Sequence, residues 1–192
     1  MTQKTNKGNG VAESVRKGLV DTIETAGDVA EAVMDTVSDT LVTTLKGTGK
    51  VGTEITNVVA ETITGVVRGT SDVGAAVGDT AKGAVIGVLR GTKQTSVEAL
   101  DMVATTASTL VMRTSEVGGN VGDAAKGAVE GAIEGAKDLG LNVEHAASAA
   151  ATGALKAAGD IGTTAVEQVQ RVATGTIKGV KVVVKEPFKS SR

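Results

Sequence analysis

The stretch SDVGAAVGDTAKGAVIGVLRGT, residues 71–92, decides the fold because it recurs as SEVGGNVGDAAKGAVEGAIEGA at residues 115–136. The two copies begin 44 residues apart, and residues 27–48 align without a gap with residues 49–70 at half that offset. Seven 22-residue units therefore run from residue 27 to residue 180. A polar amino-terminal segment with a degenerate eighth unit precedes them at residues 1–26, and a basic tail follows at residues 181–192.

The apolar positions of each unit predict a helix. In the units 27–48 and 49–70, Val, Ile or Leu falls at the third, seventh, eleventh, fifteenth and nineteenth places, as in Val29, Val33 and Val37. In a strand, residues two apart share a face, so Asp35 would lie among these valines. Twenty-two residues make six helical turns at about 3.67 residues per turn, which gathers the five aliphatic places into one stripe. We predict an all-α protein with helices over residues 29–46, 51–68, 73–90 and 117–134.

The junctions between units carry helix-stop and helix-start signals. Units end in a basic residue, Gly and Thr, as in Arg68-Gly69-Thr70. A basic last turn followed by Gly favours a helix end, and Thr before an acidic residue, as in Thr70-Ser71-Asp72, favours a helix start. Two arrangements remain open: an antiparallel array or bundle of helices about 30 Å long, or a few much longer helices that contain the Gly-Thr pairs. Turns at some junctions are the favoured interpretation.

The composition restricts how these helices can pack. Phe188 is the only aromatic residue, Trp, Tyr and Cys are absent, and the apolar residues are mostly Ala and Val. The 26 glycines allow helix backbones to approach closely, and those of residues 71–92 and 115–136 recur at spacings of four or five, with several along one edge of the aliphatic stripe. We predict a seam for helix packing or surface binding made of Gly74, Gly78, Gly83, Gly87, Gly91, Gly118, Gly122, Gly127, Gly131, Gly135, Val73, Val77, Val85 and Leu89.

The sequence offers little chemistry for catalysis. Residues 47–52 match a G-x-G-x-x-G pattern, but no strand precedes them, so a dinucleotide site is not expected. His145 is the only histidine, and without Cys or a second His it cannot complete a metal site. We therefore expect no enzyme activity, cofactor, metal or small-molecule substrate. A net charge of −2 argues against nucleic-acid binding.

The segment GVVRGT at residues 65–70, with KGAVIGV at residues 82–88, resembles the synuclein repeat region. That family has 11-residue repeats that fold into long helices on anionic lipid surfaces. The 22-residue period over residues 27–180 is also similar to that of exchangeable apolipoproteins, and the polar 11-mers resemble late-embryogenesis-abundant proteins. The resemblance implies a protein that coats a lipid or other hydrophobic surface through amphipathic repeats.

Self-association is the alternative function, in which the same seams pack against each other in a bundle, array or filament of structural or stress-protective role. No signal peptide and no membrane-spanning stretch is recognisable, so we expect a cytoplasmic or peripheral-membrane location.

Overall fold

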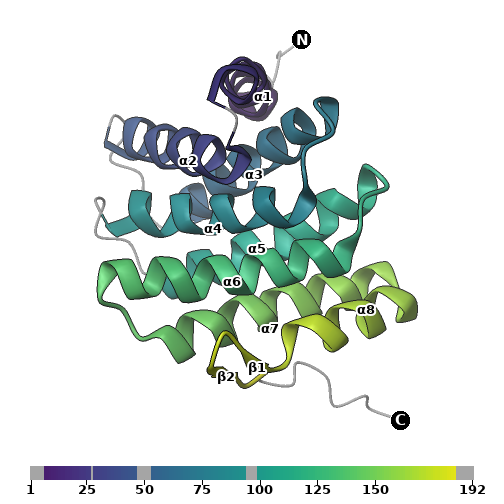
Figure 1. Ribbon diagram of the computed structural model, residues 1–192. Helices are drawn as coiled ribbons and strands as arrows, with labels where there is room; N and C mark the ends of the chain where they lie inside the picture. Colours follow the sequence, from purple (N-terminus) through teal and green to yellow (C-terminus); the bar gives the residue numbers. More distant parts are fainter. Residues whose placement is uncertain (1–6, 27, 47–52, 94–98, 185–192) are drawn as a thin grey trace.

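The computed structural model describes residues 7–26, 28–46, 53–93 and 99–184, and within these ranges the chain is an array of helices (Figure 1). The prediction of an all-α repeat array is confirmed. The helices are α1 Lys7–Ala26, α2 Val29–Lys46, α3 Thr53–Asp72, α4 Val77–Lys93, α5 Ala99–Glu116, α6 Val121–Leu139, α7 Val143–Ile161 and α8 Thr163–Ala173.

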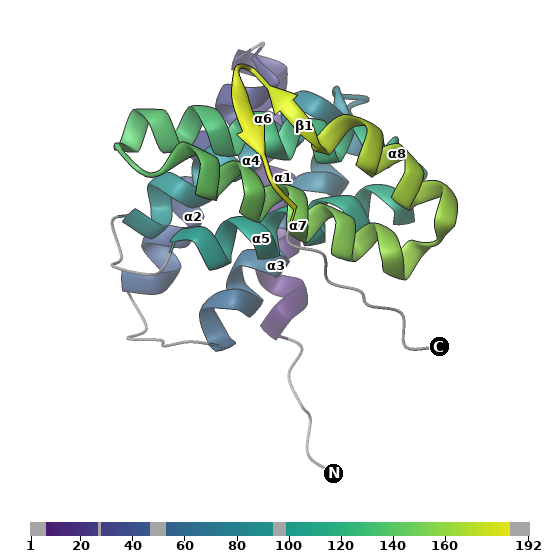
Figure 2. The same cartoon turned by 90° about the horizontal axis from the view of Figure 1, so that it is seen from below.

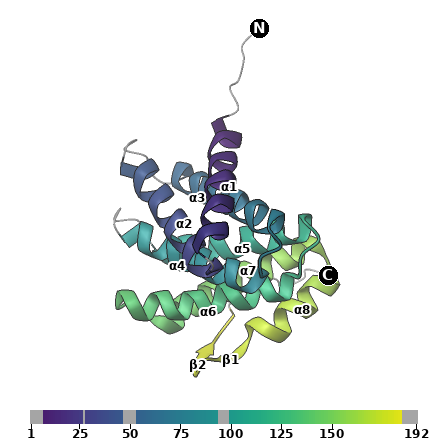
Figure 3. The ribbon, with the colours of Figure 1, turned by 45° about the horizontal axis from the view of Figure 1, so that its top comes forward.

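The helices form two layers because the chain reverses after each one. The even-numbered helices α2, α4, α6 and α8 pack side by side in one layer, and α1, α3, α5 and α7 form the other. Figure 1 shows α2, α4 and α6 one beneath another, and Figure 3 brings α1 forward at the opposite end from α8. Helices two apart in the sequence therefore run in the same direction, and most of the closest packing lies between them.

The turns lie four residues later than the junction signals predicted. Gly74, at the fourth place of its unit, ends α3 with a φ of 66°, a left-handed conformation that suits glycine. Its N–H donates to the carbonyl of Ser71 (3.2 Å), and that of Ala75 donates to Thr70 (2.8 Å), which closes a Schellman motif. The fourth-place glycines Gly118 and Gly140 end α5 and α6 in the same way.

The expected helix bounds are therefore only partly right. Helix α2 has the predicted bounds, whereas α4 and α6 begin at Val77 and Val121 rather than at residues 73 and 117. The Gly-Thr pairs at residues 69–70 and 91–92 lie inside α3 and α4, and the pair at residues 47–48 lies outside the described residues. Thr92 fits a helix interior because its hydroxyl donates to the Val88 carbonyl at 2.8 Å.

The aliphatic stripe forms the interior of the array. Val33, Val37, Val85 and Leu89 have no exposed surface, and the same holds for Val59, Ala81, Val103 and Val129 at stripe places of other units. Buried threonines such as Thr62 satisfy their hydroxyls on the carbonyl four residues earlier. In the described residues no buried side-chain N or O atom lacks a hydrogen-bond partner. The buried polar side-chain atoms of the described core are therefore all hydrogen-bonded. This core contains no aromatic ring.

The last unit is only partly helical, which corrects the expectation of helical repeats up to residue 180. After α8 the chain forms a hairpin of β1 Gly175–Ile177 and β2 Val180–Val182, with Ile177 paired to Val180. The two turn residues, Lys178 and Gly179, have φ values of 47° and 79°, as a two-residue hairpin loop requires. The β-branched residues favour a strand here, and the glycines disfavour a helix.

Candidate functional site

The glycines of α4 lie where this helix crosses α2. A Cβ at Gly87 would lie 2.6 Å from the Met34 carbonyl oxygen, and one at Gly83 would collide with the Ala30 carbonyl. A Cβ at Gly91 would lie 3.0 Å from the Cβ of Leu41. These glycines occupy the thirteenth, seventeenth and twenty-first places of their unit. Any side chain at these places would push the two backbones apart.

Helix α6 crosses α4 through the same three places. Gly127 lies on the Gly78 carbonyl, Gly131 lies on the backbone of Lys82, and a Cβ at Gly135 would lie 2.8 Å from Leu89 Cδ1. Equivalent crossings join α3 to α1 and α7 to α5, through Gly65, Gly69 and Gly153. The glycine edge thus serves contacts between parallel helices within each layer.

The register of these crossings changes along the array. Gly83 lies on Ala30, 53 residues earlier, and Gly65 lies on Ala12 with the same separation. Gly127 lies on Gly78, 49 residues earlier, and Gly153 lies on Ala104 with that separation. The second pair of crossings has therefore moved by four residues, which is about one helical turn.

The remaining residues of the predicted seam lie in turns or in the core rather than at these helix crossings. Gly74 and Gly118 belong to turns, where a Cβ would meet nothing within 4 Å, so they are not packing positions. The prediction failed for them because the left-handed helix ends use glycine too. Val73 and Val77 are half-buried beside the turn, and a Cβ at Gly122 would lie 3.1 Å from the capping Asn120 side chain. Val85 and Leu89 lie in the core, not on a free surface.

Polar residues take the glycine places at the amino-terminal end. In the unit of α2, Asp39 and Thr43 stand at the thirteenth and seventeenth places, and Asp21 stands at the seventeenth place of the unit of α1. All three are exposed. Repeat arrays need terminal units with a polar outer face, so α1 and α2 act as a cap.

The carboxy-terminal end is covered by the hairpin. Strand β2 packs against α7 (Figure 2). The backbone N–H of Val183 donates to Ser148 Oγ at 3.2 Å. Ser148 is the repeat counterpart of Ala104, whose carbonyl receives Gly153 from the next helix of that layer. The hairpin therefore lies where a further helix would continue the array.

Helix α5 departs from the repeat pattern. Thr105, Thr109 and Arg113 stand at its three glycine places, so α5 cannot approach α3 as α6 approaches α4. Arg113 Nε instead donates to Thr64 Oγ1 of α3 at 3.2 Å, and its Nη1 pairs with Glu116 at 2.6 Å. This crossing is held by polar side chains rather than by backbone contact.

The same helix and its following turn carry three of the five large apolar side chains exposed among the described residues: Leu100, Met112 and Val117. Met112 is 37% exposed and occupies the twentieth place of its unit. That place holds a charged residue in all the other units, namely Glu24, Lys46, Arg68, Arg90, Glu134, Lys156 and Lys178. This irregularity at the twentieth place is visible in the sequence, but the predicted seam was based on the glycines and did not include Met112.

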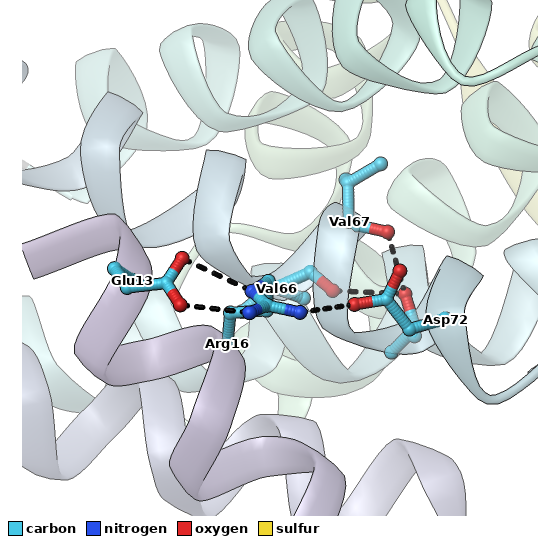
Figure 4. Close-up of polar contacts among 6 residues, drawn as sticks. Glu13, Arg16, Val66, Val67 and Asp72 are labelled. Carbon is cyan, nitrogen blue, oxygen red and sulfur yellow. Dashed lines mark hydrogen bonds and ion pairs between the residues drawn. The ribbon is translucent and has the colours of Figure 1, made fainter. Parts of the chain in front are cut away.

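Two groups of ion pairs connect neighbouring helices at the surface. Arg16 of α1 bridges Glu13 at 2.7 Å and Asp72 of α3 at 2.6 Å (Figure 4). The hydrogen bond from Arg16 lowers the pKa of Glu13, and the two carboxylates raise the pKa of Arg16. Lys82 of α4 reaches Glu134 of α6 at 2.9 Å, and their hydrogen bond lowers the pKa of Glu134 and raises that of Lys82.

No arrangement suited to catalysis is apparent in the described residues. They contain no group of three His, Cys, Asp or Glu side chains able to hold a metal ion. His145 is exposed in the first turn of α7, where its backbone N–H donates to the capping Asn142. Residues 47–52, with the G-x-G-x-x-G pattern, lie outside the described residues. Within the described parts, none of the helices is both long and apolar enough to span a bilayer.

No family model and no curated protein matches the chain. Among solved structures it is similar to a de novo designed helical repeat protein, DHR7, with a TM-score of 0.51 and 18% identity. The similarity covers 86% of this chain and 90% of the designed one. At this identity the likeness establishes the helical-repeat fold alone.

Proposed function

We propose that this chain is a non-catalytic interaction protein, a self-contained helical array that presents the outer surface of α5 to another protein. The observation that carries the proposal is the place of Met112, which is apolar and exposed where every other unit has a charged residue. Repeat proteins use extended surfaces of the array for binding, and exposed apolar side chains mark such surfaces. Val117, in the turn that follows α5, is a second exposed apolar side chain of this region.

Lipid coating has less support in this geometry than the amphipathic pattern suggested. The stripe residues Val85 and Leu89 are fully buried between helices, so a membrane could meet them only after the array opened. We expect high helicity in buffer, a cooperative thermal transition and no change of either on neutral or anionic vesicles. A chain that is largely unfolded in buffer and becomes helical on vesicles would restore the lipid-coating hypothesis.

Self-association through the glycine seams has less support for a related reason. The crossing glycines already pack against helices of the same chain, and Asp21, Asp39 and Thr43 occupy the corresponding exposed places of the first two helices. We expect a monomer in sedimentation velocity experiments over a wide concentration range. Concentration-dependent growth that is abolished by Thr43→Lys would favour assembly through this end instead.

The interaction surface can be tested with a photo-cross-linking residue placed at Ser108, which is half-buried one helical turn before Met112. We expect protein adducts in cells from this position and none from the same residue at the exposed Asp123 of α6. The change Met112→Lys restores the charge that Arg68 and Lys156 have at this place. It should remove the adducts while circular dichroism stays unchanged. Adducts that persist in folded Met112→Lys would contradict the proposal.

A further inference from the structure

The geometry points to a binding pocket for a protein segment: we propose that the space between the α3–α4 turn and the α5–α6 turn takes one apolar side chain whose neighbours in the bound chain are basic. We call this space the turn pocket, and its aliphatic lining residues are Val67, Ala75, Val77, Leu110 and Val117. Met112, which carries the proposed function, is not among the lining residues, so the two proposals can be tested separately.

The turn pocket forms where two turns of the same kind lie next to each other. Gly74 and Gly118 both line it, and both have the left-handed conformation, with φ values of 66° and 75°. Figure 1 shows the two turns at the same end of the array. Gly162 holds the same place in the α7–α8 turn, but its φ is 143° and its N–H donates to the Ala158 carbonyl at 3.0 Å. The next turn at this end therefore has a different shape.

The turn pocket is deep enough to receive a side chain. Leu110 and Thr114 line it and are almost fully buried, whereas Val117 and Gly118 are exposed at its edge. Its volume is about 190 Å³. Apolar cavities of about 150 Å³ bind benzene. The pocket therefore has room for a leucine side chain, which is smaller than benzene.

Polar groups around the turn pocket already have hydrogen-bond partners. The hydroxyl groups of Thr70 and Thr80 donate to backbone carbonyls four residues earlier, at 2.9 and 3.0 Å. The N–H groups of Gly118 and Gly119 donate to carbonyls of Ser115 and Thr114 at the end of α5. A polar ligand would lose its hydrogen bonds to water here without replacement, whereas an apolar group would not.

Glycine at position 119 leaves space for the ligand. A Cβ at Gly119 would lie 2.8 Å from Thr114 Cγ2 and 3.5 Å from Val77 Cγ2. Thr114 and Val77 both line the turn pocket, and the preceding turn has Ala75 at the place of Gly119. Any side chain at position 119 would therefore enter the pocket or displace its wall.

Two carboxylates flank the mouth of the turn pocket. Asp72 directly follows Ser71, and Glu116 directly precedes Val117, and both neighbours line the pocket. Each carboxylate pairs with one arginine at 2.6 Å, Asp72 with that of α1 and Glu116 with that of α5. These two ion pairs by themselves leave the mouth neutral.

Two further carboxylates make this end of the array acidic. Asp79 and Asp123 are exposed in the first turns of α4 and α6. A Cβ at Gly78 would lie 3.9 Å from the backbone oxygen of Asp123, so the two first turns adjoin. Lysine or arginine residues on either side of an inserted apolar side chain would meet these carboxylates, which favours a basic segment over an acidic one.

The test titrates the full chain with short peptides and follows the methyl signals of Val67, Val77, Leu110 and Val117 by nuclear magnetic resonance. The probe is the tripeptide Lys-Leu-Lys with blocked ends. We expect it to shift these signals and to bind at least about tenfold more tightly than Lys-Ala-Lys, whose central side chain is too short to fill the pocket. Glu-Leu-Glu should bind more weakly than Lys-Leu-Lys, and the difference should shrink at high salt.

Each peptide comparison can overturn the proposal on the unaltered protein. If Lys-Leu-Lys leaves the methyl signals unchanged, the pocket does not take an apolar side chain. If Lys-Ala-Lys binds equally well, the peptides are attracted by surface charge alone. If Glu-Leu-Glu binds as tightly as Lys-Leu-Lys, the acidic surroundings do not select a basic segment.

Two matched substitutions locate the binding. Ala75→Leu fills the turn pocket from its wall and should abolish the binding of Lys-Leu-Lys. Ala76→Leu adds the same side chain at the next position, which is exposed and does not line the pocket, and should leave binding intact. With circular dichroism unchanged in both, equal behaviour would contradict binding in this pocket. Met112→Lys should bind the peptide as the unaltered chain does, so the pocket and the proposed function can fail separately.

Discussion

Two crossings within the same molecule differ in the residues at the thirteenth, seventeenth and twenty-first places of the repeat. Helix α6 approaches α4 with Gly127, Gly131 and Gly135, and its backbone lies directly on carbonyl groups of α4. Helix α5 has Thr109 and Arg113 at equivalent places and packs less closely on α3. Helix-to-helix distance in this fold is therefore set by whether a Cβ is present, because the core offers no large side chains that could fill a wider gap.

The two crossings also differ in the side chains on their outer surfaces. Where glycine brings the backbones together, as between α4 and α6, the outer surface is covered by ion pairs such as Lys82 with Glu134. Where glycine is missing, as in α5, exposed places carry Leu100 and Met112. The unit that has lost the packing signature is the same unit that has gained exposed apolar side chains, which is the combination expected for a binding surface.

The largest expected effect comes from charging the core that both crossings enclose. Val85→Asp combined with Leu89→Asp places two carboxylates where neither side chain has exposed surface. Each buried charge costs several kcal/mol, and the sum approaches the roughly 5–15 kcal/mol that stabilises a domain. We expect loss of helicity in circular dichroism without any lipid present. A folded double variant would show that the stripe is not the core.

The crossing between α4 and α6 should be sensitive to a single methyl group. Gly131→Ala puts a Cβ 2.5 Å from the Lys82 carbonyl oxygen, in the middle of two backbones that cannot both move freely. Overpacking of this kind typically costs about 1–3 kcal/mol, which exceeds the gain of about 1 kcal/mol in helix propensity. Thr105→Ala, at the half-buried thirteenth place of the α5 unit, is the comparison, and it should be close to neutral in a urea melt. Equal losses for the two variants would show that the glycine crossing is not special.

The period of the repeat and the helical stripe could be predicted from the sequence, because Val, Ile and Leu alternate with charge at fixed places. The positions of the turns could not, because glycine at the fourth place of the unit and glycine at the twenty-first place look alike in sequence. Only the structure separates Gly74, with a φ of 66°, from Gly91, which lies in a crossing.

The candidate binding surface illustrates the same limit. The loss of glycines over residues 93–114 is visible in the sequence, but exposure is not. Met102 and Leu110 of that unit are buried, whereas Leu100 and Met112 are exposed, and all four are apolar additions to the repeat. Which of them reach solvent depends on how α5 is rotated between α3 and α7, and this rotation is a property of the packed array.

Glycine without a crossing should behave in the opposite way to Gly131. Gly18 lies inside α1, and a Cβ there would meet nothing within 4 Å. Gly18→Ala should therefore raise the free energy of unfolding by about 0.5–1 kcal/mol, the helix-propensity difference alone. A stability decrease on urea denaturation would mean that α1 is packed against something at this face.

The smallest effect concerns the ion pair that covers the crossing of α4 and α6. Lys82 hydrogen bonds to Glu134 at 2.9 Å and lowers the pKa of that carboxyl group below its usual 4.5. A carboxyl group with a lowered folded-state pKa stabilises the fold at pH values above the unfolded-state pKa, and the contribution disappears as the pH falls through the folded-state value. Glu134 is 43% exposed, so solvent screening limits the expected loss in Glu134→Gln to about 0.2–1 kcal/mol at pH 7. Urea midpoints measured from pH 7 downwards should converge with those of the unaltered chain in acid, whereas Glu167→Gln, at an exposed place on α8, should show little difference at any pH. A loss that stays constant across the pH range would mean that Glu134 contributes through packing of its methylene groups rather than through its charge.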